Sequence, residues 1–194
     1  MKAYLTSTGN ETDTDTAYET QYMRQKKIIL VTGGQRSGKS EFSEKLALEH
    51  SDTPVYLATA RVADDEFRER VRKHKARRGP NWSTIEEEIF LSRHDLSQKT
   101  VLIDCVTMWV TNVFFASGED VTASLEKLKS EFDRFTDHHD AVYIFVSNEI
   151  GSGGVSPNAM TRRFTDLQGW FNQYIAAHAD EVYLTVSGIP LKIK

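Results

Sequence analysis

Short apolar runs alternate along the chain with longer segments in which apolar residues recur at helical spacing. The apolar runs lack strict alternation with polar residues, which is typical of strands buried on both faces of a parallel sheet. They predict five strands and a short last one, in the segments KKIILVTGG (26–34), TPVYLATA (53–60), KTVLIDCV (99–106), DAVYIFVSNEI (140–150), DEVYLTVSGI (180–189) and PLKIK (190–194).

Helices are predicted between these strands, over residues 37–50, 64–78, 121–135 and 157–179. Two of them carry an apolar stripe, formed by Leu125, Leu128, Phe132 and Phe135 and by Phe164, Leu167, Phe171 and Ile175. Strands separated by helices predict one α/β domain with a mostly parallel sheet that helices cover on both faces.

The composition agrees with a single globular domain in the cytoplasm. The chain has 194 residues, of which 39% are hydrophobic and 27% charged, and its net charge of −4 argues against a general nucleic-acid binder. One cysteine, Cys105, excludes an intramolecular disulfide and fits a reducing compartment. No apolar run approaches the roughly 18 residues that span a bilayer, and the first residues lack the apolar stretch of a secretory signal.

Residues 1–26 differ from the rest, because threonines alternate there with acidic residues and few side chains can enter a core. We expect a flexible arm, followed by the single domain at residues 27–194. The alternative is an arm that packs on a neighbouring subunit through Tyr18, Tyr22 and Met23.

A phosphate-binding loop (P-loop) motif follows the first predicted strand. It fits the pattern G-x-x-x-x-G-K-[ST] with Gly33, Gly34, Gln35, Arg36, Ser37, Gly38, Lys39 and Ser40. Glycines let backbone N–H groups converge on phosphate oxygens, and the following helix adds the positive end of its dipole. We expect Lys39 to contact the β- and γ-phosphates and Ser40 to bind Mg²⁺. The strand before the motif and the helix after it are the context that nucleotide binding requires.

Asp104 ends the third predicted strand after the apolar residues Val101, Leu102 and Ile103. The carboxyl ends of strands in an open α/β sheet face the crevice where ligands bind, so Asp104 is a candidate second contact for Mg²⁺, directly or through water. The alternative is a carboxylate that only caps the following turn.

Residues 61–78 hold eight basic residues against four acidic ones. The acidic residues lie toward the start of this predicted helix and the basic ones toward its end, which the helix dipole favours. A solvated helix is one interpretation, and a polyphosphate cradle of Lys75, Arg77 and Arg78 is the other. His74 lies in the same cluster, where neighbouring cations favour the neutral imidazole that can act as a nucleophile, although a lone histidine there is often only a surface residue.

The chain resembles the bifunctional adenosylcobinamide kinase/adenosylcobinamide-phosphate guanylyltransferase family of cobalamin biosynthesis. The resemblance runs from residue 28 to residue 194, through ILVTGGQRSGKS, YLATA, DDEFRERVRKHKARRGPNW, VLIDCVTMWVTNVFF, VSNEIGSGGVSP and ADEVYLTVSGIPLKIK. Many families share the P-loop, whereas the H-x-x-R-R-x-x-x-W segment and the VSGI…KIK ending are far more specific.

This resemblance implies a P-loop NTPase-like fold assembled as a homotrimer. It implies that the enzyme phosphorylates adenosylcobinamide with ATP or GTP. It also implies a second reaction, in which the enzyme takes GMP from GTP onto a histidine and transfers it to adenosylcobinamide phosphate. Independent support for a trimer is weak, because Trp109, Phe114 and Phe115 fit either an interface or a core.

The family's histidine falls on His74. The implied nucleotide contacts are the P-loop from Gly33 to Ser40 and, beyond it, Thr59, Ala60, Arg61, Lys75, Ala76, Arg77, Arg78, Glu86 and Asp104. A carboxylate at Glu86 can accept hydrogen bonds from the N1–H and 2-amino group of guanine, but Glu86 is also one of three consecutive acids that solvent alone can explain. Lys73 stands where some members carry a second histidine, and Asn148 and Glu149 match the family without a clear role.

Two other functions fit parts of the sequence. A single-activity P-loop kinase would use the basic helix only to clamp phosphates. A non-catalytic nucleotide-binding subunit would need the P-loop alone, because a P-loop does not establish turnover.

Overall fold

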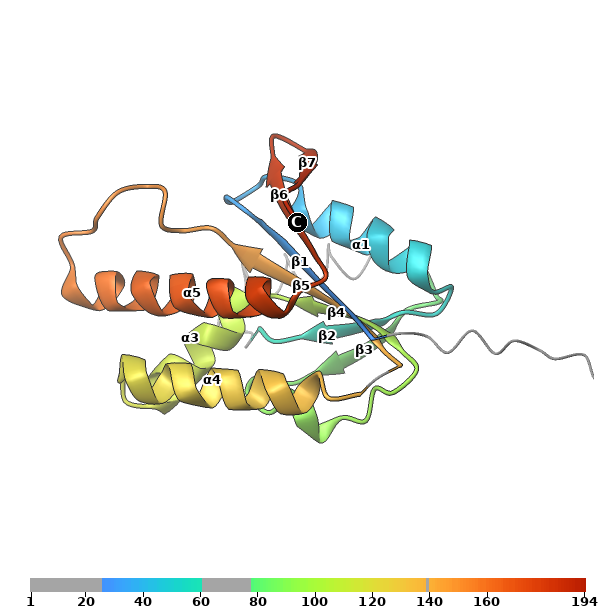
Figure 1. The fold of residues 1–194 in the computed structure, drawn as a ribbon, viewed down its shortest axis with the longest axis horizontal. Helices are drawn as coiled ribbons and strands as arrows, with labels where there is room; N and C mark the ends of the chain where they lie inside the picture. The colour runs from blue at the N-terminus through green and yellow to red at the C-terminus, as the bar shows by residue number, and fades with distance from the viewer. Residues whose placement is uncertain (1–25, 61–77, 139) are drawn as a thin grey trace, which may run out of the picture.

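The computed structural model describes residues 26–60, 78–138 and 140–194 (Figure 1). These residues form one seven-stranded sheet of β1 (Lys27–Gly33), β2 (Val55–Ala58), β3 (Ser83–Glu86), β4 (Thr100–Asp104), β5 (Val142–Asn148), β6 (Glu181–Val186) and β7 (Ile189–Lys192). The helices are α1 (Lys39–His50), α3 (Val106–Ala116), α4 (Val121–Phe135) and α5 (Ala159–His178), with a 3₁₀ turn, η1, at Leu91–Arg93.

The strands lie in the order β3-β2-β4-β5-β1-β6-β7. All neighbours are parallel except β6 and β7, which form an antiparallel hairpin at one edge. The predicted α/β fold with a mostly parallel sheet is therefore confirmed. The carboxyl ends of β1 through β5 meet at one edge of the sheet, where ligands bind in open α/β folds.

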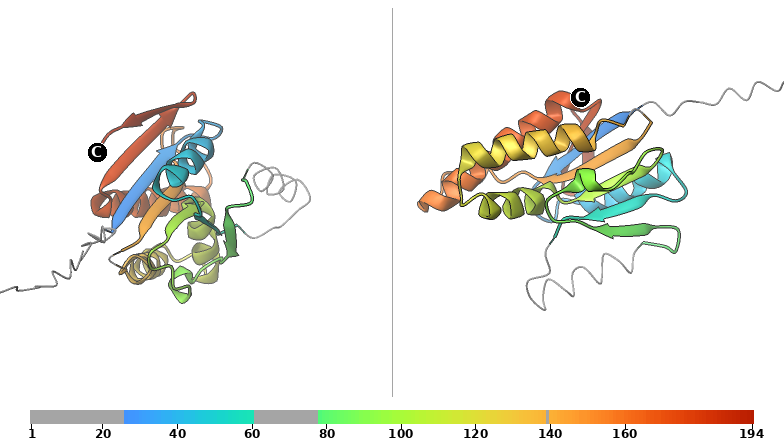
Figure 2. Two further views of the ribbon diagram at one scale, coloured as in Figure 1. Left: turned by 90° about the vertical axis from the view of Figure 1, so that its right-hand side faces the viewer. Right: turned by 90° about the horizontal axis from the view of Figure 1, so that it is seen from below.

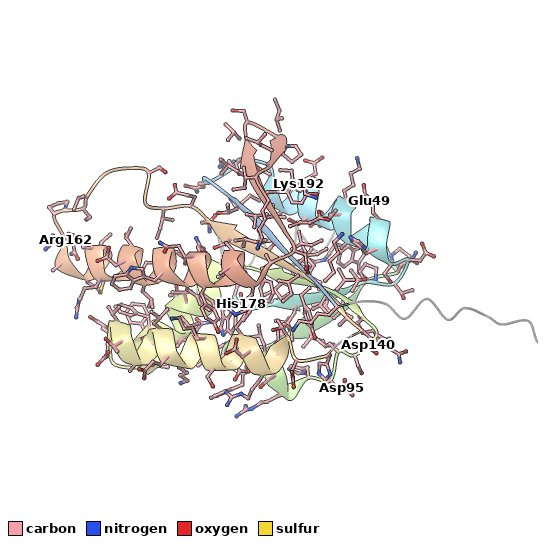
Figure 3. All side chains as sticks on the ribbon, in the orientation of Figure 1. Glu49, Asp95, Asp140, Arg162, His178 and Lys192 are labelled. Atoms are coloured by element: carbon pink, nitrogen blue, oxygen red, sulfur yellow. The ribbon has the colours of Figure 1, made fainter. Side chains whose placement is uncertain are left out.

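Helix α1 covers one face of the sheet, and α3, α4 and α5 cover the other (Figures 1 and 2). Strand β1 contributes side chains to the hydrophobic core on each face, because successive side chains of a strand point to opposite faces. Ile28 and Leu30 pack with α3 to α5, whereas Ile29 and Val31 pack under α1. Burial on both faces explains why β1 reads as an uninterrupted apolar run. Charged side chains such as Glu49 and Lys192 lie on the outside of these layers (Figure 3).

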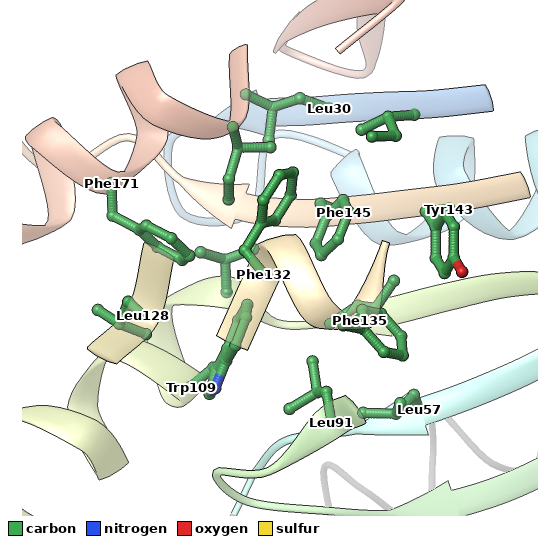
Figure 4. Packing of buried hydrophobic residues seen from close by; sticks show 14 of the residues in the cluster. Leu30, Leu57, Leu91, Trp109, Leu128, Phe132, Phe135, Tyr143, Phe145 and Phe171 are labelled. Atoms are coloured by element: carbon green, nitrogen blue, oxygen red, sulfur yellow. The ribbon is translucent and has the colours of Figure 1, made fainter. Parts of the chain in front are cut away.

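The larger core is rich in aromatic residues and centres on Phe132 of α4 (Figure 4). Its ring lies 5.2 Å from that of Phe145 in β5 and 6.4 Å from that of Phe171 in α5. Trp109 of α3 packs edge-on against Phe171, with the ring centroids 5.3 Å apart. This layer holds α3, α4 and α5 against the sheet.

Two elements escaped prediction. Strand β3 has the sequence STIE and is mostly exposed, so it carries no apolar run, and only its pairing with β2 makes it a strand. Helix α3 is apolar around much of its circumference, because it packs between the sheet and the other two helices. Trp109 and Phe114 are fully buried in that core and are not candidate interface residues, whereas Phe115 is 55% exposed.

Other boundaries agree with the expectations. The helix predicted at 121–135 is α4, and the short last strand is present as β7. The predicted arm and the predicted basic helix at 64–78 lie outside the described residues, apart from Lys26 and Arg78. Within the described ranges, no helix is long and apolar enough to cross a bilayer.

Candidate nucleotide site

The P-loop joins the end of β1 to the start of α1, as its motif predicts. Gly33 has no space for a side chain, because a Cβ there would lie 2.5 Å from the carbonyl oxygen of Thr185. Gly38 has φ of +95°, and its Cβ would meet the Cα of Gly188 at 3.0 Å. Both glycines are therefore required by the close approach of the β6–β7 hairpin as well as by the turn of the loop.

The β6–β7 hairpin holds the P-loop by hydrogen bonds. The hydroxyls of Ser37 and Thr185 lie 2.8 Å apart, and Thr185 donates to the carbonyl oxygen of Thr32 at 3.2 Å. At the turn of the hairpin, the N–H of Gly188 donates to the carbonyl oxygen of Ser37 at 2.9 Å. Ser187 and Gly188 have φ of 52° and 83°, the positive values that a tight two-residue hairpin requires. The hairpin is thus part of the wall of the phosphate site.

Lys39 lies in the first turn of α1 with its side chain buried beside the loop. Its Nζ donates to the carbonyl oxygen of Gly34 at 2.6 Å. Burial lowers the pKa of Lys39, and the nearby Cys105 and Asp104 act in the opposite direction. Lys39 at the start of α1 and Asp104 at the end of β4 thus lie at the same edge of the sheet.

Asp104 ends β4, in register with Ala58 at the end of β2. One of its oxygens, Oδ2, accepts a hydrogen bond of 3.0 Å from the hydroxyl of Tyr56 in β2. The guanidinium carbon of Arg78 lies 3.3 Å from the centre of the Tyr56 ring. Burial and the charge of Asp104 raise the pKa of Tyr56, so this hydroxyl keeps its proton and remains a donor to the carboxylate.

Thr59 and Glu86 lie at the same edge of the sheet. The hydroxyl of Thr59, directly after β2, donates to the carbonyl oxygen of Cys105 at 2.7 Å, and its own carbonyl accepts from Asn112 of α3 at 2.8 Å. Glu86 ends β3 in register with Ala58, and its side chain is exposed. The ends of β2, β3 and β4 thus place Thr59, Glu86 and Asp104 along one line.

The sequence matches a family described as "Cobinamide kinase / cobinamide phosphate guanyltransferase" over residues 29–193. The chain belongs to this family. It is 36% identical over 169 residues to the bifunctional adenosylcobalamin biosynthesis protein CobP of Pseudomonas aeruginosa, covering 85% of this chain and 96% of that protein. It is 37% identical over 185 residues to the corresponding CobU protein of Escherichia coli K12, covering 86% of this chain and 99% of that protein.

Family membership confirms the predicted pair of activities, a kinase and a guanylyltransferase. Among solved structures, the chain resembles a type III secretion system ATPase of pathogenic bacteria, with a TM-score of 0.50 and 12% identity over 82% of this chain and 51% of that one. That likeness supports the P-loop ATPase fold and nothing further.

The structure brings together most of the nucleotide contacts that the family resemblance implied. Those at the carboxyl edge of the sheet are Gly33, Gly34, Gln35, Arg36, Ser37, Gly38, Lys39, Ser40, Thr59, Ala60, Arg78, Glu86 and Asp104. Those outside the described residues are Arg61, His74, Lys75, Ala76 and Arg77. The role of each of these residues in the family's reactions stays a prediction.

Sequence reasoning missed Tyr56, Thr185 and Gly188. The tyrosine lies in an ordinary apolar strand, and its contact with Asp104 depends on the pairing of β2 with β4. All three residues lie in segments that carry the family resemblance: Tyr56 begins YLATA, Gly188 lies in VSGI, and Thr185 directly precedes VSGI. Only the fold shows that Thr185 and Gly188 contact the P-loop.

Asn148 and Glu149, which had no predicted role, make structural contacts beside the P-loop. Asn148 donates to the hydroxyl of Thr107 at 3.1 Å. The carboxylate of Glu149 accepts from the N–H of Gly151 at 2.7 Å, and its own N–H donates to the carbonyl oxygen of Gly33 at 3.0 Å. Glu149 therefore shapes the turn after β5 and joins it to the P-loop.

The described residues contain no group of three or more histidine, cysteine or acidic side chains that could hold a metal ion. Ser40 and Asp104 nevertheless offer the hard oxygen ligands that Mg²⁺ prefers. Few protein ligands suit this ion, because it usually keeps several waters and takes its remaining ligands from substrate phosphates. The donor set therefore fits a Mg²⁺–nucleotide complex better than a closed metal cage.

Proposed function

We propose that the chain phosphorylates adenosylcobinamide with ATP or GTP and then transfers GMP through His74. The observation that carries the proposal is the P-loop, with Lys39 at the start of α1 and Asp104 at the end of β4, on the same edge of the sheet. In the kinase step, the oxygen of the cobinamide hydroxyl attacks the γ-phosphorus of the nucleotide and its proton passes to solvent. The bond from the γ-phosphorus to its bridging oxygen breaks, and the nucleoside diphosphate leaves with that electron pair. The loop N–H groups and Lys39 stabilise charge on the transferred group.

In the second step, the imidazole nitrogen of His74 attacks the α-phosphorus of GTP. A nitrogen–phosphorus bond forms, the bond from the α-phosphorus to its bridging oxygen breaks, and pyrophosphate leaves with that electron pair. A phosphate oxygen of adenosylcobinamide phosphate then displaces His74 and gives adenosylcobinamide-GDP. The basic residues Lys75, Arg77 and Arg78 stabilise the developing charge.

Mg²⁺ is proposed to bind Ser40 and Asp104 together with the nucleotide phosphates. Bound there, it would neutralise charge on the phosphate oxygens. Asp104→Asn is expected to lose activity more than metal-free nucleotide binding. Full activity of this variant at limiting Mg²⁺ would assign Asp104 a structural role only.

Covalent labelling with GTP that carries the label on the α-phosphate tests the function. We expect acid-labile, alkali-stable label on the wild-type protein and none on His74→Ala, which should keep its kinase activity because that step needs no protein nucleophile. His138→Ala is the matched control, since His138 precedes β5 at the opposite edge of the sheet and should keep the label. Label on His74→Ala would make another residue the nucleophile, with Lys73 the first candidate.

The same experiment separates the other functions. Phosphoryl transfer without label on the wild-type protein would indicate a single-activity kinase. Nucleotide binding with neither reaction would indicate a non-catalytic subunit.

We also propose that the chain assembles as a homotrimer. The support is an apolar edge on the β6–β7 hairpin, where Ile189, Leu191 and Ile193 are 70%, 58% and 58% exposed. Exposed apolar side chains in a row on an edge strand are a common sign of an interface. Light scattering at concentrations where the enzyme is active should give the trimer mass, and a monomer mass would reject the assembly.

A further inference from the structure

Tyr56 combines two contacts that no packing role requires. Its side chain is 7% exposed in the core under α1, where a phenylalanine would fill the same space. The buried hydroxyl instead donates to Oδ2 of Asp104 at 3.0 Å. A buried tyrosine O–H usually finds a hydrogen-bond partner, and the partner of the Tyr56 hydroxyl is Asp104, the candidate metal ligand.

The sheet register explains how the two residues meet. Tyr56 pairs with Leu102 of β4, and Ala58, two residues further along β2, pairs with Asp104. Positions two apart in a strand share a face, and directly paired positions of neighbouring strands also share one. Tyr56 and Asp104 therefore lie on the α1 side, and the tyrosine reaches along the strands to the carboxylate.

The ring of Tyr56 makes the second contact, with Arg78. The guanidinium carbon lies 3.3 Å from the ring centre, the arrangement of a cation–π pair. Within the described part of the chain, Nε and Nη1 of Arg78 are buried and have no hydrogen-bond partner. The ring is thus the surface that holds this end of the arginine beside the nucleotide site.

We propose that Tyr56 is a positioning residue for both reactions: its hydroxyl fixes the carboxylate of Asp104 toward the metal-bound phosphates, and its ring holds Arg78 toward the same nucleotide. The proposal rests on the proposed function, in which Asp104 contacts Mg²⁺ and Arg78 contacts the nucleotide. It adds a residue that touches neither the metal nor the substrate and acts through two that do.

Two substitutions separate the two contacts. Tyr56→Phe keeps the ring and removes the hydroxyl, whereas Tyr56→Leu removes both. Tyr143→Phe is the matched control, because Tyr143 is a fully buried tyrosine in the other core whose hydroxyl has no partner among the described residues. The unfolding midpoint of each variant shows whether it is folded. If Tyr56→Leu is not folded, Tyr56→Phe alone decides the proposal.

Two measurements report on the site. One is the Mg²⁺ concentration for half-maximal kinase activity, and the other is calorimetric binding of a non-hydrolysable GTP analogue with and without Mg²⁺. For Tyr56→Phe we expect a rise of about three- to tenfold in the Mg²⁺ requirement, from the loss of one hydrogen bond to a charged group, and unchanged metal-free binding of the analogue. Tyr56→Leu should in addition weaken metal-free binding about threefold or more, because Arg78 loses its support. Tyr143→Phe should match the wild-type protein in both measurements.

A wild-type Mg²⁺ requirement in Tyr56→Phe would overturn the proposal. So would an equal loss of binding with and without the metal, because that pattern indicates general damage to the site. Asp104→Asn distinguishes this failure from failure of the proposed function. If Asp104→Asn raises the Mg²⁺ requirement and Tyr56→Phe does not, only the proposed role of Tyr56 is wrong. If Asp104→Asn has no effect, both the assignment of Asp104 to Mg²⁺ and the role of Tyr56 are wrong. In the double variant Tyr56→Phe/Asp104→Asn, the tyrosine change should add nothing.

Discussion

Replacing Thr185 by valine should loosen the P-loop while leaving the shape of β6 unchanged. Valine has nearly the same volume as threonine, so the main loss is the hydroxyl that accepts from Ser37 at 2.8 Å and donates to the carbonyl of Thr32 at 3.2 Å. Each intramolecular hydrogen bond contributes about 1 kcal/mol, and a buried hydroxyl left without a partner costs about 1–3 kcal/mol. Because Ser37 is only 8% exposed, we expect the free energy of unfolding to fall by about 2 kcal/mol.

Urea unfolding measures this loss, and nucleotide titration shows whether it reaches the site. Ser37 belongs to the P-loop, so Thr185→Val should also raise the KM for the nucleotide in the kinase and guanylyl transfer steps alike. Thr185→Ser restores the hydroxyl and should recover most of both effects. A valine variant with wild-type stability and unchanged nucleotide KM would refute the conclusion that the hairpin supports the loop.

Three further outcomes follow from the structure. Hydrogen bonds from Lys27 and Tyr183 lower the pKa of Glu181 to about 2, so Glu181 should stabilise the fold above pH 4.5 and lose this contribution as the pH falls toward 2. In Glu181→Gln, the loss of stability between pH 4.5 and pH 2 should be smaller than in the wild-type protein by about 1 kcal/mol, after allowance for solvent screening. An unchanged dependence of stability on pH would contradict the role of Glu181 and its hydrogen bonds. Phe132→Ala should lower the free energy of unfolding in urea by about 3–5 kcal/mol, because the side chain is 1% exposed at the centre of the aromatic core, and a loss below about 1 kcal/mol would contradict that placement. Lys39→Ala should abolish kinase activity measured with γ-labelled ATP while the protein stays folded, and a near-normal rate would show that the P-loop lysine does not serve the reaction.

Most of the fold could be predicted, because its elements have clear local patterns. The apolar stripe from Leu125 to Phe135 predicts α4 with the bounds that the structure shows. Strand β3 and helix α3 escaped prediction for opposite physical reasons. The first has almost no apolar residues and depends on its partner strand. The second has further apolar residues outside its buried face, at Met108, Phe115 and Ala116, and these obscure the helical spacing of the buried ones.

The candidate site divides in the same way. The P-loop and Asp104 were predictable because each lies in a short, contiguous segment directly after an apolar strand. Tyr56 and Thr185 were not, because their roles depend on residues far away in the sequence. Ser37 and Thr185 are separated by 148 positions, and Tyr56 and Asp104 by 48. A sequence motif identifies groups that lie close together in the sequence. Only the fold identifies the distant residues that support them.

The place of β1 within the sheet has a consequence for how the protein is made. This first strand lies between β5 and β6, so its backbone has no partner on either side until residues 142–186 have been synthesised. The N–H of Ile28, for example, donates to the carboxylate of Asp180, which lies 152 positions later in the sequence. Contacts this distant in sequence form late and slowly, since a long loop must close before they give any stability. A nascent chain that stops before Thr185 carries the whole P-loop sequence but lacks the residues of β6 and β7 that contact the loop, so the loop can take its final shape only after most of the chain has been synthesised.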